Sequence, residues 1–167
     1  KWTLVGRLQP GTQVLSRWRL MAHWVVDRLM LGSPFRTAML ELGGSPIPAA
    51  ILRILGAKVG RRSALLDVTV GADVDLLEIG DDVWTGSAVV LAGRTLVEAS
   101  SRGGCNDADR SALLDKSTQC LQMQHVRVGS GSLLAEQVMV VGSEVAENQI
   151  CGSITLIDRN FEPNSII

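Results

Sequence analysis

The sequence lacks several features that would assign it to a common functional class. It has no Tyr and only two Phe, and its 16 Lys and Arg are balanced by 17 Asp and Glu with no basic run. Stacking side chains and a cationic stripe for nucleic acid are therefore absent. The three widely spaced cysteines, Cys105, Cys120 and Cys151, fit neither a zinc pattern nor a disulfide framework. We expect reduced thiols, a cytoplasmic protein, no metal and no nucleic-acid partner.

The start of the given sequence does not resemble a signal peptide. The first residue is Lys rather than Met, and no apolar segment leads to a small-residue cleavage site. The 167 residues are enough for one domain with its own core. We expect a piece of a longer or processed protein, with a tail at 158–167.

A six-residue rhythm begins after residue 58. Steps that start with an aliphatic or β-branched residue followed by Gly or Ala begin at Ile79, Thr85 and Leu91, and the phase returns at Val128 and Leu134. A short fixed period is typical of a solenoid, in which each repeat buries its apolar edge against its neighbours. Because β-branched residues favour strands and glycines allow corners, we predict a mainly β solenoid over 58–157. A polar, turn-rich excursion interrupts it at 99–124.

Residues 1–57 are predicted to form a helical segment in front of the solenoid. Over 13–31, apolar residues recur on one side at helical spacing, and polar residues fall on the other. The apolar side holds Val14, Leu15, Trp18, Met21, Ala22, Val25, Val26 and Leu29, and the polar side holds Arg17, Arg19, His23, Asp27 and Arg28, broken by Leu20 and Trp24. This helix either packs on the solenoid or lies on a membrane surface, which Trp and Arg together favour. Its ionisable residues argue against a spanning helix.

The repeat also resembles a known family. The similarity is carried by Ile79-Gly80-Asp81-Asp82-Val83-Trp84-Thr85-Gly86, continued at 88–93. This motif is similar to that of the hexapeptide-repeat acyltransferases. The resemblance implies a left-handed parallel β-helix of triangular section and a homotrimer. Residues 42–46, 52–60 and 75–82 are further similar to the C-terminal region of poly-lysine-synthetase-type nonribosomal peptide synthetases, over about 13–157. That region combines membrane segments with such domains, which implies a module of a larger synthetase.

The resemblance implies transfer of an acyl or aminoacyl group from a thioester to an amine or hydroxyl. The donor would be coenzyme A by the broader family, or a carrier protein's phosphopantetheine by the synthetase resemblance. A base must deprotonate the acceptor, and imidazole suits this step near neutral pH. His125, where the excursion rejoins the solenoid, is the candidate base. The alternative is that His125 only ends a loop in solvent.

Other members of the candidate site are less well defined by the sequence. An Asp of the excursion, Asp107, Asp109 or Asp115, could orient the imidazole. The backbone N–H groups of Gly129 or Gly131 could stabilise an oxyanion, unless these glycines only turn corners. Trp84 is expected to pack at a coil edge or trimer seam. One solenoid histidine is too few for a shared three-histidine zinc site.

A second function stays open because the family's usual His motif, with flanking Asn and Pro, is missing. In this alternative the chain is a non-catalytic, trimerising or scaffolding β-helix of a multidomain, membrane-associated synthetase. A solenoid can serve in this way because it needs only stacked repeats, and fold alone does not decide between the two functions.

Overall fold

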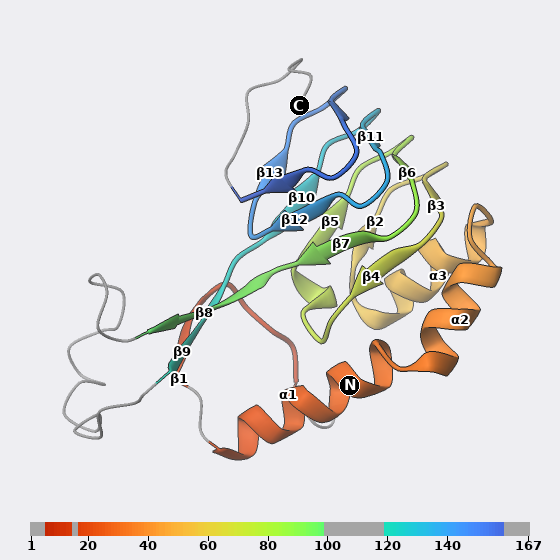
Figure 1. Cartoon of the computed structure of the whole chain (residues 1–167). Helices are drawn as coiled ribbons and strands as arrows, with labels where there is room; N and C mark the ends of the chain where they lie inside the picture. Colours follow the sequence, from red (N-terminus) through yellow and green to blue (C-terminus); the bar gives the residue numbers. More distant parts are fainter. Residues whose placement is uncertain (1–5, 15–16, 99–118, 159–167) are drawn as a thin grey trace.

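Four stacked coils with helices at one end make up the part of the chain that the structure describes. The computed structural model describes residues 6–14, 17–98 and 119–158. Figure 1 shows the coils rising from the helices α1–α3, with an arm projecting from the side of the stack. The solenoid predicted from the six-residue spacing is therefore confirmed.

Three parallel four-stranded sheets form the sides of the stack, which we call face 1, face 2 and face 3. Face 1 consists of β2 (Lys58–Val59), β5 (Leu77–Ile79), β10 (Val126–Val128) and β13 (Glu144–Val145). Face 2 consists of β3 (Ala64–Leu65), β6 (Trp84–Thr85), β11 (Leu133–Leu134) and β14 (Ile150–Cys151). Face 3 consists of β4 (Val68–Val70), β7 (Val89–Ala92), β12 (Met139–Val141) and β15 (Leu156–Ile157). Each coil gives one strand to every face.

The interior of the stack is built from columns of the aliphatic repeat position. In-register pairing aligns Val59, Ile79, Val128 and Val145 on face 1, Leu65, Thr85, Leu134 and Cys151 on face 2, and Val70, Leu91, Val140 and Ile157 on face 3. Burying these side chains against the next coil is what stabilises a solenoid. Cys151 belongs to such a column as a free thiol, and burial raises its pKa, so it is a packing residue rather than a nucleophile.

The corners between faces place side chains at positive φ. One corner has Arg62, Asp82 and Asn148 at φ of 56°, 54° and 57°, and the next has Ala88, Gln137 and Ile154 at 56°, 58° and 61°. This left-handed region suits Asn or Asp, whereas a β-branched side chain is strained there.

Replacing Ile154 by Asn is expected to stabilise the protein. Ile154 is 80% exposed, so little packing is lost and part of a strain of about 1–2 kcal/mol is relieved. Urea unfolding should give a free energy of unfolding higher by about 0.5–1 kcal/mol. Ile150→Asn, on an exposed strand position of β14, is the control and should not stabilise. A lower stability for Ile154→Asn would show that this corner is not strained.

Three helices and a short 3₁₀ turn accompany the coils. They are α1 (Arg17–Met30), α2 (Ser33–Glu41), α3 (Pro46–Leu55) and η1 (Val74–Leu76). Ser45 caps α3, because its hydroxyl accepts a hydrogen bond from the Ile47 N–H at 3.3 Å. Gly56, at φ 112°, ends the helix in the left-handed conformation. α3 buries Ala49 and Leu52 in the core that it shares with the coils.

The helix expected over 13–31 is shorter and turned differently from the prediction. Gly11–Val14 forms strand β1, and α1 begins at Arg17. His23, assigned to the polar side, is only 6% exposed, whereas the apolar Trp18 is 74% exposed. The physical reason is that Asp27, also from the polar side, pairs with Arg94 and so turns this side toward the solenoid. None of the described helices is long and apolar enough to cross a membrane.

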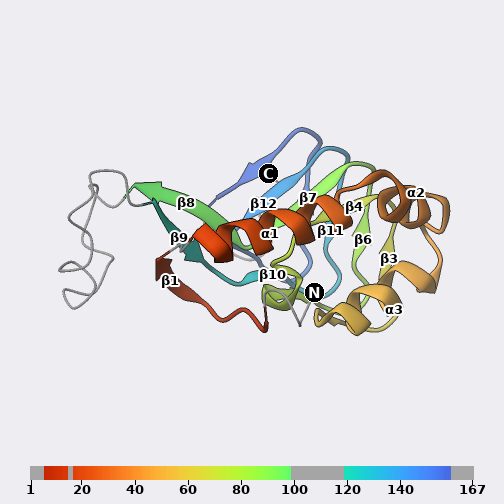
Figure 2. The same cartoon turned by 90° about the horizontal axis from the view of Figure 1, so that it is seen from below.

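The excursion leaves the solenoid as an arm. β8 (Arg94–Glu98) and β9 (Gln119–Met123) pair antiparallel, and β1 pairs with the other side of β9. Figure 2 shows this three-stranded arm extending away from the coils. The excursion predicted at 99–124 therefore begins at Arg94, while the repeat resumes at Val126 as predicted.

Candidate functional site

His125 lies at the root of the arm, directly between β9 and β10. The chain is fixed on both sides of it. The Gln124 N–H donates to the Gly93 carbonyl at 2.7 Å, which closes the arm at its base. Val126 is buried and pairs with Leu77 on face 1. The His125 side chain is exposed, so a fixed backbone presents an accessible imidazole.

A hollow of about 510 Å³ opens beside this imidazole. Its lining comes from the arm root, face 1 and the residue before β1, and it comprises Pro10, Glu78, Met123, Gln124, His125, Arg127, Gly142, Ser143 and Glu144. A smaller hollow of about 180 Å³ shares Glu78 and Arg127 and continues along face 1 to Lys58 and Ser130. The larger volume lies within the usual range for small-molecule sites, about 300–1,000 Å³.

The outward side of face 1 carries a ladder of alternating charges. Lys58, Glu78, Arg127 and Glu144 are adjacent in register across its four strands. Lys58 binds Glu78, and Arg127 Nη1 lies 3.2 Å from Glu144 Oε1. The hydrogen bond from Lys58 is the main reason why the pKa of Glu78 is lowered, and the nearby His125 and Arg127 add to it. Glu78 is therefore an anionic neighbour for the His125 imidazole.

The predicted site residues are only partly brought together. Gly129 donates its N–H to the Val145 carbonyl at 2.8 Å, and Gly131 donates to the Asp81 carbonyl at 2.9 Å. Both amides thus donate hydrogen bonds within the solenoid, and the expectation that they bind an oxyanion stays a prediction. Gly129 lies so close to the next coil that a Cβ would come within 2.6 Å of the Ala146 backbone.

The remaining candidates lie elsewhere. Asp107, Asp109 and Asp115 fall outside the described residues. Trp84 is exposed on face 2, in register with Leu133, and does not line either hollow described above. Within residues 6–14, 17–98 and 119–158, no group of three His, Cys, Asp or Glu side chains is placed to bind a metal ion. Arg127 is the donor-bearing side chain beside His125 that the sequence argument missed.

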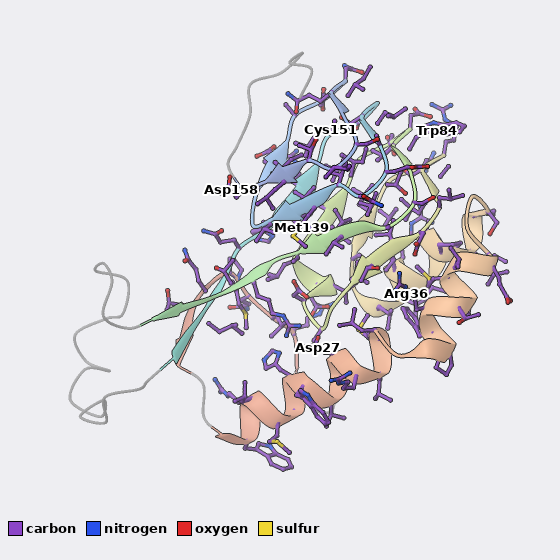
Figure 3. The ribbon with its side chains drawn as sticks, in the orientation of Figure 1. Asp27, Arg36, Trp84, Met139, Cys151 and Asp158 are labelled. Carbon is purple, nitrogen blue, oxygen red and sulfur yellow. The ribbon has the colours of Figure 1, made fainter. Side chains whose placement is uncertain are left out.

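A buried polar cluster joins α1 to the other side of the arm root. Arg94 Nη2 lies 2.5 Å from Asp27 Oδ2, and Arg94 Nε lies 3.8 Å from Asp73 Oδ1. Asp27 also accepts the Ala72 N–H at 2.9 Å. His23 Nδ1 lies 3.4 Å from Arg94 Nη1, and since a guanidinium only donates, this nitrogen is the acceptor of a neutral imidazole. Figure 3 shows Asp27 pointing from α1 toward the coils.

Acid is expected to weaken the folded state through His23. Burial first, and then the Arg94 charge, lowers the pKa of His23 from 6.5, while Asp27 and Asp73 raise it by less. The folded-state pKa of His23 lies below its unfolded-state value, so neutral His23 favours the folded state. This contribution to the free energy of unfolding is complete above the unfolded-state value, about pH 6.5, and is lost as the pH falls through the folded-state pKa. Urea unfolding from pH 7.5 to pH 5 should show the loss, and His23→Gln should flatten it. An unchanged slope in His23→Gln would contradict the assignment.

Comparison with known proteins supports the architecture. No protein-family model and no curated protein matches this sequence. A solved hexapeptide-repeat-containing acetyltransferase from Vibrio cholerae O1 biovar eltor, complexed with acetyl coenzyme A, is similar over 91% of this chain and 84% of its own, with 12% identity and a TM-score of 0.51. A maltose O-acetyltransferase from Clostridium difficile 630 matches over 84% and 83%, with 13% identity and a TM-score of 0.48. The Vibrio likeness confirms the predicted fold, a left-handed parallel β-helix preceded by helices.

Proposed function

We propose that this protein transfers an acyl group from a thioester to an amine or hydroxyl acceptor, with His125 as the general base. The observation that carries the proposal is the position of His125, which stands on a fixed backbone at the edge of a 510 Å³ hollow that anionic Glu78 and cationic Arg127 also line. A base, a charge partner and a donor beside a cavity are the elements that acyl transfer requires.

Each side chain has one role in this mechanism. The His125 imidazole removes the proton from the acceptor as the acceptor attacks the thioester carbonyl. The carboxylate of Glu78 stabilises the imidazolium that forms. The Arg127 guanidinium, whose pair with Glu144 is solvent-exposed, turns to the oxyanion of the tetrahedral intermediate at little cost. Collapse breaks the carbon–sulfur bond, and the imidazolium returns its proton to the leaving thiolate.

The acyl donor in this proposal is coenzyme A, and a carrier protein's phosphopantetheine is the alternative. Both present the same pantetheine thioester, so the hollow beside His125 suits either. Lys58, in the smaller hollow on face 1, supplies a cation for the phosphates of a free coenzyme. The Vibrio structure contains acetyl coenzyme A, which supports this choice of donor.

The proposed assembly is a homotrimer, and we place its contacts on face 2. The outward residues Trp84, Leu133 and Ile150 are exposed apolar neighbours on this face. Exposed apolar patches of this kind are typical of protein–protein contacts. As a module of a larger synthetase, the trimer would bring its copies to one set of carrier proteins.

The experiment that tests the function is a search for acylated products by intact-mass spectrometry. The chain is mixed with acetyl, longer acyl and aminoacyl thioesters, on coenzyme A and on a carrier protein, together with amine and hydroxyl acceptors. We expect transfer from at least one donor above the rate without protein. If no donor and acceptor pair gives a product and the protein forms a stable trimer in sedimentation, the scaffolding function replaces acyl transfer. The observation that favours scaffolding is that the His125 side chain is exposed.

A further inference from the structure

One side of α1 is apolar and is turned away from the solenoid. Ala22, Val26 and Met30 are buried against the protein, but most of the large apolar side chains of the helix are not. The exposed ones are Trp18, Leu20, Met21, Trp24 and Leu29, with Leu31 just beyond the helix. Figure 2 shows α1 running along the outside of the molecule, in front of the coils. An exposed apolar side of this size is typical of a contact surface.

The charges around this apolar side have one sign. Arg28 is exposed, and its guanidinium stands 5.6 Å from the centre of the Trp24 ring. Asp27 is the one acidic residue in the helix, and it is turned inward to Arg94. The described outer side of α1 therefore combines apolar area and tryptophan with the positive charge of Arg28.

We propose that α1 lies flat on an anionic lipid surface, with Leu20, Trp24 and Leu31 inserted at the headgroup level. Its 14 residues are too few to cross a bilayer, which needs about 20, so the helix can only lie in the interface. Tryptophan rings and snorkelling arginines are suited to that depth, and Arg28 complements anionic headgroups.

A second copy of the chain is a less suitable occupant of this surface. A two-fold contact would place the same side of α1, with Arg28, against itself, and the helix offers no outward acidic residue to pair with this charge. A lipid surface with negative headgroups satisfies the apolar and the cationic parts together.

Vesicle flotation with the 167-residue chain tests this proposal. We expect the protein to float with vesicles of phosphatidylcholine and phosphatidylglycerol, and to float much less with phosphatidylcholine alone. The triple change Leu20→Gln, Trp24→Gln and Leu31→Gln should abolish flotation. Arg28→Glu should weaken binding by at least about fivefold, since each cation near an anionic surface contributes about that factor.

Matched variants on the coils serve as controls. Met139→Gln with Leu156→Gln removes exposed apolar area from face 3, and Arg61→Glu makes the same charge change at an exposed corner. Both should float like the unchanged protein, and circular dichroism should show that every variant is folded. The proposal is overturned if the unchanged protein does not float, or if the α1 and face 3 variants lose flotation equally. It is also overturned if the α1 triple variant dissociates an oligomer in sedimentation while flotation is retained.

Discussion

Replacing His125 by Ala is expected to reduce acyl transfer by about 10²–10⁴-fold, the usual contribution of a positioned general base. The loss should appear in kcat, because the imidazole acts on the proton of the acceptor during reaction and contributes little to binding. The initial rate of thiol release from the donor measures it. Since the side chain is exposed, the free energy of unfolding should stay nearly unchanged.

Two companion variants make this result specific. Glu78→Gln removes the anionic neighbour while keeping the size, and we expect a smaller fall in kcat together with a changed pH profile. Glu136→Ala, at an exposed corner that contributes to neither hollow described here, should retain the full rate. Full activity of His125→Ala would remove His125 from the mechanism.

Replacing Arg94 by Leu is expected to cause the largest loss of stability, roughly 3–5 kcal/mol. The Arg94 guanidinium pairs with the carboxylates of both Asp27 and Asp73, which have low exposure. Its removal takes the Arg94 charge away from both carboxylates. The effect should reach the arm as well, because Asp73 also accepts the N–H of Gly93 at the start of the arm. Urea unfolding of the variant measures the loss.

The control for Arg94 is an ion pair on the outside of the solenoid. Lys58→Ala removes an exposed partner of Glu78 and should change the free energy of unfolding by less than about 1 kcal/mol. Restoring a cation with Arg94→Lys should recover part of the loss, but not the geometry by which one guanidinium contacts several groups. Equal stability of Arg94→Leu and the unchanged protein would show that the cluster does not secure α1.

The solenoid could be predicted from the sequence because its period is local. Each coil repeats the same choice of a buried aliphatic residue followed by a small one, so positions such as Ile79 and Leu134 identify the interior without knowledge of distant contacts. The cap at Ser45 and the stop at Gly56 were equally predictable, because capping depends on residues next to one another.

The candidate site could be predicted only where it depends on the chain order. His125 follows the excursion directly, so its place at the arm root could be predicted. Glu78 and Arg127 lie 49 positions apart in the sequence. They are neighbours because β10, the first strand after the excursion, pairs directly with β5 on face 1. A count of hexapeptide steps across the excursion would have found this pair.

The orientation of α1 shows the limit of periodicity. Its spacing suggested that the polar side faces water, but the protein buries His23 and pairs Asp27 with Arg94 from the arm. A pairing partner 67 residues away outweighs the local pattern. In the same way, the spacing did not indicate that the N–H groups of Gly129 and Gly131, the candidates for an oxyanion site, donate hydrogen bonds to neighbouring coils.

The central claim is that the thioester binds at the root of the arm, and amide resonance mapping tests it most directly. Titrating the isotope-labelled protein with coenzyme A should produce saturable shifts around Gln124, His125, Arg127 and Gly142, with face 2 unchanged. Shifts confined to face 2 or to the helices, or no saturable shift during measured transfer, would contradict the claim.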